Sequence, residues 1–178
     1  QLYYLEKFGR ICTTGYNVDS FGHNGNMPQL LIKGGMRTYV MMRPNTTENP
    51  DMPEDLFWWD GVDGSRVLTY RIPTGYGETG AEALDRILKN FSERADKNGH
   101  GMMLFYGVGN HGGGPTKGDI EHLRAVKAEG FYELDFSSPD EYFEAMCAAR
   151  IDIPVWNGDM QHHASGCYSS ISLVKQLN

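Results

Sequence analysis

The chain has 178 residues and a formal net charge of −7, from 16 Lys and Arg against 23 Asp and Glu. An acidic chain without a Lys/Arg-rich run lacks the cationic surface that binds phosphates, which argues against a nucleic-acid partner. No apolar stretch approaches the ~18 residues of a membrane-spanning helix, so no membrane contact is expected. The three cysteines are widely spaced and form no CxxC pair, which argues against a disulfide framework or a Cys-rich zinc site.

The predicted elements alternate between strands and helices along the chain. Strands are predicted at 11–18, 38–42, 56–59, 66–72, 102–106, 131–136 and 151–156. Helices are predicted at 28–33, at 80–97, after the caps Thr116 and Ser138, and over the final residues 171–177. The alternation predicts an α/β fold, either a largely parallel sheet or a (β/α) barrel, with seven strands. In such folds the reactive groups lie at the carboxyl ends of the strands.

Asp19 occupies such a position, because it follows the predicted strand 11–18 and precedes a short helix. A carboxylate there can be a reagent, but Asp also caps turns and helices, and the pattern alone leaves both readings open. The adjacent pair His162-His163 follows the last predicted strand. Neutral imidazole binds zinc well, but from this pattern alone a solvent-exposed loop pair is the favoured interpretation.

Two further segments carry candidate ligand-binding groups. The loop 107–116 is rich in glycine and contains Asn110 and His111, but it lacks the Gly-Lys-Ser/Thr ending of a phosphate-binding loop. Trp58 and Trp59 are adjacent on a predicted strand, so one of them faces the core and the other can face a ligand. Asp60 and Tyr76 lie in the loops after the predicted strands 56–59 and 66–72, and they are also candidate contacts to a ligand.

Six motifs in this order resemble the catalytic domain of glycoside hydrolase family 38, the zinc-dependent retaining α-mannosidases, and most closely the bacterial branch. The motifs are Gly15-Tyr16-Asn17-Val18-Asp19-Ser20-Phe21-Gly22-His23, Met41-Met42-Arg43-Pro44, Phe57-Trp58-Trp59-Asp60-Gly61, Gly64-Ser65-Arg66-Val67-Leu68-Thr69-Tyr70-Arg71, Gly109-Asn110-His111-Gly112-Gly113-Gly114-Pro115-Thr116 and Gln161-His162-His163-Ala164-Ser165-Gly166. They cover nearly the whole chain. The resemblance implies that residues 1–178 are part of this catalytic domain, with the last ~15 residues beginning a helical region.

The resemblance also implies roles for individual residues. Asp19 would be both the nucleophile and a zinc ligand, and His163 would be the second zinc ligand. A retaining glycosidase needs a carboxylate that attacks the anomeric carbon, and zinc can hold the vicinal hydroxyls of a mannose ring. The residues expected to contact the α-mannoside are Trp58, Asp60, Tyr76, Asn110 and His162.

Two departures from the family pattern qualify these expectations. The H-x-D pair of zinc ligands does not occur in the chain, so the remaining ligands, and a first strand, are expected from another part of a longer mannosidase. Asn110 stands where several relatives carry an acidic proton donor, and His111 is therefore a candidate acid/base or substrate contact. Asp60 and Asp119 are the other carboxylates near predicted strand or loop ends and stay open as alternatives for the acid/base. The isolated segment is expected to be inactive. Localisation and oligomeric state stay open, with the cytoplasm favoured for a bacterial protein.

Two other functions remain open from the residues. A zinc-dependent polysaccharide deacetylase also uses Asp and His ligands, but there the metal activates water against an N-acetyl group. A non-catalytic sugar-binding fragment is the other alternative, and it would tolerate the loss of the Asp19 carboxylate.

Overall fold

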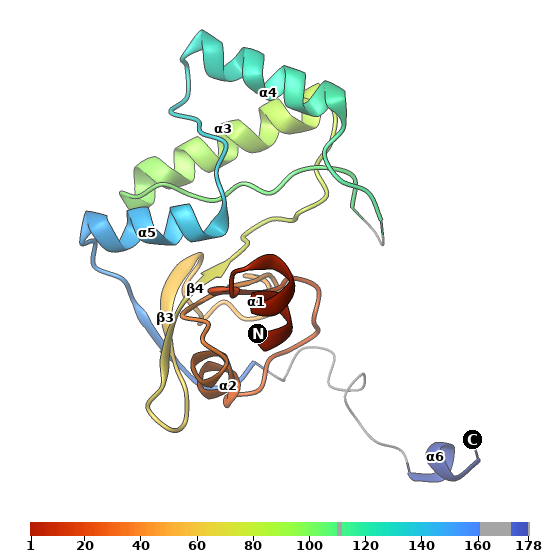
Figure 1. The fold of residues 1–178 in the computed structure, drawn as a ribbon. Helices are drawn as coiled ribbons and strands as arrows, with labels where there is room; N and C mark the ends of the chain where they lie inside the picture. Colours follow the sequence, from red (N-terminus) through yellow and green to blue (C-terminus); the bar gives the residue numbers. More distant parts are fainter. Residues whose placement is uncertain (110–111, 161–171, 178) are drawn as a thin grey trace. The chain divides into compact units, whose positions relative to one another are not determined.

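The computed structural model describes residues 1–109, 112–160 and 172–177, which divide into two compact units (Figure 1). The first unit, called the sheet unit here, comprises residues 1–73 and 153–178. The second, called the helical unit, comprises residues 74–152. The two units are described separately below.

The sheet unit contains a five-stranded sheet in the order β1-β2-β4-β3-β5. The strands are β1 (Thr14–Asn17), β2 (Thr38–Met41), β3 (Leu56–Asp60), β4 (Arg66–Arg71) and β5 (Val155–Asn157). Strands β1, β2 and β4 are parallel, whereas β3 runs antiparallel to β4, and β5 runs parallel to β3. The carboxyl ends of β1, β2 and β4 therefore lie at one edge of the sheet, and those of β3 and β5 at the other.

One face of this sheet forms the core of the unit with helix α2 (Met27–Lys33). Its buried side chains are Leu31, Tyr39, Met41, Met52, Phe57, Trp59, Val67 and Met160. Gly15 on β1 allows α2 to approach closely, since a Cβ at this residue would lie 2.7 Å from Leu31 Cδ2 and 2.8 Å from Tyr39 Cδ2. Any larger residue would force these packed side chains apart.

The sheet unit also contains two short helices at the ends of the chain. Helix α1 (Leu2–Phe8) buries none of its residues and was not predicted from the sequence, which shows no core-facing stripe there. Helix α6 (Ser172–Leu177) confirms the predicted helix at the carboxyl end. No helix in the described part of the chain is long and apolar enough to cross a membrane.

The helical unit contains α3 (Ala81–Asn98), α4 (Lys117–Glu129) and α5 (Pro139–Ala149). The predicted apolar stripe of α3 is confirmed, because Leu84, Ile87, Leu88 and Phe91 are buried in one cluster with α4. The predicted caps are also confirmed: Thr116 and Ser138 each complete a capping box, which satisfies backbone N–H groups at the helix start.

The predicted strands 102–106 and 131–136 are wrong. Both segments are described, and neither belongs to a strand. Their alternating apolar side chains, Met102, Leu104, Tyr106, Tyr132 and Leu134, pack against the α3–α4 cluster instead. An alternating pattern places side chains on a surface, but a strand also needs a neighbouring backbone for its hydrogen bonds. The sheet consequently has five strands rather than seven, and a barrel is not confirmed, whereas the α/β class and the mainly parallel pairing are.

Candidate active site

Asp19 lies at the edge of the sheet where the parallel strands end. It follows β1 by two residues, and Arg43 follows the parallel neighbour β2 by two residues. Because parallel strands end at the same edge, the two side chains meet, and Arg43 Nε donates to Asp19 Oδ1 at 3.0 Å. Arg43 also lies 5.2 Å from the centroid of the Phe21 ring, and its Nη1 is 3.6 Å from Glu48 Oε1.

The carboxylate of Asp19 is oriented by this contact but still accessible. Its side chain is 52% exposed, whereas that of Arg43 is 29% exposed. Arg43 occupies Oδ1, and no described residue donates to Oδ2. An oriented carboxylate with one accessible oxygen is suited to nucleophilic attack or to metal coordination. A residue whose only role is to cap a turn would instead use its oxygens on backbone N–H groups.

His23 lies at the end of the same loop and is almost completely buried, at 1% exposure. Burial lowers the pKa of its imidazole to about 4, although the backbone of Arg43 acts in the opposite direction. Its backbone pairs with Met160 in both directions: His23 N donates to Met160 O at 3.3 Å, and Met160 N donates to His23 O at 2.8 Å. The loop that carries Asp19 is therefore joined to the segment that leads to residues 162 and 163.

His162 and His163 lie outside the described residues, so their predicted roles stay predictions. Among the residues that are described, no group of three or more His, Cys, Asp or Glu side chains is assembled to hold a metal ion. Four ligands are usual for zinc in proteins. Asp19 can supply a carboxylate oxygen to one of these positions, while the described residues do not supply a complete shell.

Asp60 and Trp58 lie toward the other edge of the sheet. Asp60 is the last residue of β3, which runs antiparallel to β4. At the start of β3, the carbonyl of Asp55 accepts a hydrogen bond from the backbone N of Arg71, the last residue of β4. Asp60 lies five residues farther along the chain than Asp55. At ~3.3 Å per residue this separates Asp60 from the carboxyl edge of the parallel strands by about 17 Å. The structure therefore does not bring Asp60 and Asp19 together.

The side chain of Asp60 is engaged by Arg66. Nε of Arg66 donates to Oδ1 at 2.5 Å and Nη2 donates to Oδ2 at 2.7 Å, and this pairing lowers the pKa of Asp60. The guanidinium of Arg66 also lies 6.0 Å from the centroid of the Trp58 ring. Trp59 is fully buried on the opposite face, as the alternation predicts. Substrate contact by Trp58 and Asp60 stays a prediction.

Tyr76 and the glycine-rich loop lie in the helical unit. A Cβ at Gly109 would lie 3.6 Å from Tyr76 Cε2, so this ring packs against the loop. The loop is closed by a hydrogen bond from Val108 N to Gly114 O at 2.9 Å. Gly113 has a φ of 138°, and a Cβ there would lie 2.5 Å from Val108 O, so only glycine fits. Asn110 and His111 fall outside the described residues, and their predicted roles are untested.

Asp119, which also follows a loop, has a structural role. Its carboxylate is buried and accepts hydrogen bonds from Thr79 Oγ1, Gly80 N and Thr116 N, which joins the starts of α3 and α4. These bonds, from Gly80 first, lower its pKa to about 2. A carboxylate held in this way is not available to transfer a proton to a substrate.

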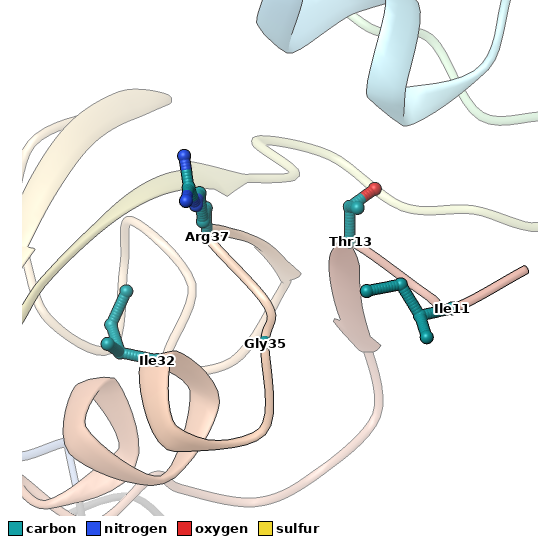
Figure 2. Close-up of a pocket in the computed structure, with 5 residues that line it drawn as sticks. All are labelled: Ile11, Thr13, Ile32, Gly35 and Arg37. Carbon is teal, nitrogen blue, oxygen red and sulfur yellow. The ribbon is translucent and has the colours of Figure 1, made fainter. Parts of the chain in front are cut away.

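A cavity of about 470 Å³ lies at the opposite edge from Asp19, before β1 and β2 begin (Figure 2). It is lined by Ile11, Thr13, Ile32, Gly35 and Arg37. This lining contains one cation and no carboxylate, so the cavity does not supply the acid and nucleophile of a hydrolase.

Sequence reasoning assigned no role to Arg43 or His23, although both lie in recognised motifs. The sequence carried part of the signal for Arg43, since Arg43 follows a predicted strand as Asp19 does, but only the fold made the two strands parallel neighbours. The sequence carried no comparable signal for His23, because the burial of His23 depends on Tyr39 of β2 and Trp59 of β3.

Comparisons with known proteins indicate the family and the fold of the chain. The family model for the N-terminal domain of glycosyl hydrolases family 38 matches residues 1–159. Alpha-mannosidase G of Dictyostelium discoideum is 28% identical over 180 residues, and alpha-mannosidase 2C1 of Homo sapiens is 29% identical over 184 residues, each covering 100% of this chain. The chain spans 17% of the length of both relatives.

A solved structure shows the same fold. The α-mannosidase from Enterococcus faecalis V583 superposes with a TM-score of 0.71 at 23% identity, over 90% of this chain and 19% of that chain. With the family model matching most of its length, this chain belongs to glycosyl hydrolases family 38, in the region of that family's N-terminal domain.

Proposed function

We propose that the protein is a retaining exo-α-mannosidase that hydrolyses terminal α-linked mannose from oligosaccharides, with Asp19 as its nucleophile. The observation that carries the proposal is the Asp19 carboxylate, half exposed at the carboxyl edge of the parallel strands and held by Arg43 through one oxygen only. Family membership and relatives named alpha-mannosidase support the substrate class. In this proposal residues 1–178 contribute part of one catalytic domain, and other parts of a longer mannosidase complete it.

Asp19 would react in two steps. Oδ2 attacks the anomeric carbon as the bond to the leaving oxygen breaks, and that oxygen takes a proton from a general acid, for which His111 is the candidate. Water then attacks the same carbon, gives its proton to the same group and releases Asp19. Arg43 holds Oδ1 throughout, which fixes the direction of Oδ2 and reduces the orientational freedom lost in the transition state.

The expected cofactor is zinc, with Asp19 and His163 among its ligands. When bound, zinc supplies Lewis-acid contacts to the hydroxyls of the sugar ring. The pairing of His23 with Met160 supports this ligand set. His163 follows Met160 by three residues, and three residues span at most about 11 Å, so the chain length is compatible with a zinc ligand at His163. The ligands that the described residues lack are expected from elsewhere in the protein.

The test is hydrolysis of a nitrophenyl α-mannoside by the full-length protein, with and without added zinc. We expect release of nitrophenol from the α-mannoside but not from the β-mannoside, with retention of the anomeric configuration in the first sugar product. Asp19→Asn should abolish turnover, whereas Asp51→Asn, which alters an exposed carboxylate of the same unit, should not. Inversion of configuration would contradict the nucleophile.

The alternative functions give different results in the same assay. A deacetylase would release acetate from an N-acetylated oligosaccharide and leave the mannoside intact. A sugar-binding fragment would retain mannoside affinity, without turnover, in wild type and in Asp19→Asn alike. Either result would reject the mannosidase proposal.

A further inference from the structure

His23 is an almost completely buried titratable side chain in the loop that begins at Asp19, and the proposed reaction does not use it. Its ring lies edge-on to two aromatic rings, with centroid distances of 5.5 Å to Tyr39 and 6.2 Å to Trp59. Nδ1 is 2.9 Å from the hydroxyl of Tyr39, which is itself 2% exposed. Nε2 is buried without a hydrogen-bond partner among the described residues. Burying an imidazole carries a desolvation cost, so packing alone does not account for the choice of His over Phe.

The loop from Asp19 to His23 is held at both ends by β2. At one end Arg43, two residues beyond β2, binds Asp19 Oδ1 at 3.0 Å. At the other end Tyr39, within β2, binds His23 Nδ1. Inside the loop, Ser20 Oγ donates to Asn17 Oδ1 at 2.6 Å. The two contacts therefore close a ring through the five loop residues 19–23 and the five residues 39–43 around the end of β2.

We propose that His23 is a positioning residue, which fixes the Asp19 carboxylate through the Tyr39–His23 hydrogen bond acting together with the Arg43–Asp19 ion pair. This inference rests on the proposed mannosidase function. Without the hydrogen bond, the loop keeps the contacts of Arg43 with Asp19 and Phe21 but loses the side-chain hydrogen bond at His23, and the carboxylate can shift relative to the sugar. A displacement of about 1 Å in a reacting group can lower a catalytic rate by roughly 10²-fold.

The backbone of His23 extends the effect to a second segment. Its two backbone hydrogen bonds hold Met160, the residue that directly precedes the motif Gln161-His162-His163. Burial also lowers the pKa of His23 to about 4, so the imidazole is neutral at neutral pH and does not compete with Arg43 for the charge on Asp19.

Tyr39→Phe is the sharpest test, because it removes one hydroxyl and keeps the ring. The matched control is Tyr70→Phe, which removes a hydroxyl from another fully buried tyrosine, on the neighbouring strand β4 and the opposite face of the sheet. Both variants are expected to lower the melting temperature by a similar amount. In the full-length protein with zinc, we expect only Tyr39→Phe to lower kcat for the α-mannoside, by roughly 10-fold, with KM changed by less than about 2-fold.

A second pair of variants tests the imidazole itself. His23→Asn can present an amide near the position of Nδ1, whereas His23→Leu cannot. We expect Asn to retain more of kcat than Leu at equal folded fraction. If Tyr39→Phe and Tyr70→Phe both leave kcat at the wild-type value, or if Asn and Leu are equally impaired, the positioning role is rejected while the mannosidase function stands. A wild-type protein that does not hydrolyse the mannoside would reject both.

Discussion

Asp19 and Asp60 are superficially alike, since each lies at or beyond the end of a strand and each pairs with an arginine. Arg43 touches one oxygen of Asp19, which is 52% exposed, whereas Arg66 occupies both oxygens of Asp60, which is 23% exposed. The two also lie toward opposite edges of the sheet, because β3 is antiparallel to β4. Strand direction, rather than the local sequence, places the two carboxylates toward opposite edges of the sheet.

The largest effect expected from this comparison is on turnover. Asp19→Asn should lower kcat for an α-mannoside by about 10⁴-fold or more, as expected when a nucleophile is removed. Asp60→Asn, with the same change in charge, should lower it by less than about 10-fold, because it lies at the other edge. Steady-state kinetics on the folded variants measures both values. Equal losses would show that the two carboxylates share one site.

Substitution of Arg43 should lower turnover more than substitution of Arg66. Arg43→Gln should lower kcat by roughly 10- to 100-fold, because the remaining carboxylate loses its charge-assisted contact and its orientation. Arg66→Gln should leave kcat within about 2-fold of wild type, since it frees Asp60 without touching Asp19. A loss in Arg66→Gln as large as that in Arg43→Gln would favour a substrate contact by Asp60.

The buried His23 should make the loop of Asp19 sensitive to acid. Its folded pKa of about 4 lies below the ordinary value of 6.5, so the unfolded chain binds a proton first as the pH falls. The contribution of the neutral His23 imidazole to the free energy of unfolding is therefore complete above pH 6.5 and is lost between pH 6.5 and 4. This loss is at most about 3 kcal/mol. Chemical denaturation across this range should show the loss in wild type, and a smaller one in His23→Asn.

Asp119 is a third carboxylate for comparison, because both of its oxygens accept hydrogen bonds within the helical unit. Asp119→Asn should lower the melting temperature at neutral pH, because Gly80 N and Thr116 N lose a charged acceptor. The folded pKa is lowered from 3.8 to about 2, so the stability due to this group is lost as the pH falls from about 4 to 2. The difference in melting temperature between wild type and variant should shrink over that range. A constant difference would argue against the ionic role.

The smallest effect is expected for the Asp60–Arg66 pair on stability. Half of the Arg66 side chain is exposed, and exposed ion pairs contribute little to folding. Arg66→Gln should change the melting temperature by less than about 4 °C. A larger shift would mean that the pair fixes the β3–β4 turn, and would make Asp60 a structural residue outright.

Helices were more predictable than strands in this chain. The apolar spacing of Leu84, Ile87, Leu88 and Phe91 and the caps Thr116 and Ser138 act within a few residues, so the sequence carries the whole signal. The segments 102–106 and 131–136 carry an equally regular pattern but lie against helices. A strand is completed by a backbone from elsewhere in the chain, and no local pattern specifies that partner.

The sequence by itself determined the α/β class, the helices with their caps, and the position of Asp19 just beyond a strand. Only the tertiary structure decided that β3 runs against β4, that Arg43 meets Asp19, and that His23 is enclosed by Tyr39 and Trp59. The reason is physical: turn chemistry and helical spacing depend on neighbours along the chain, whereas strand direction, burial and ion pairing depend on residues that folding brings together.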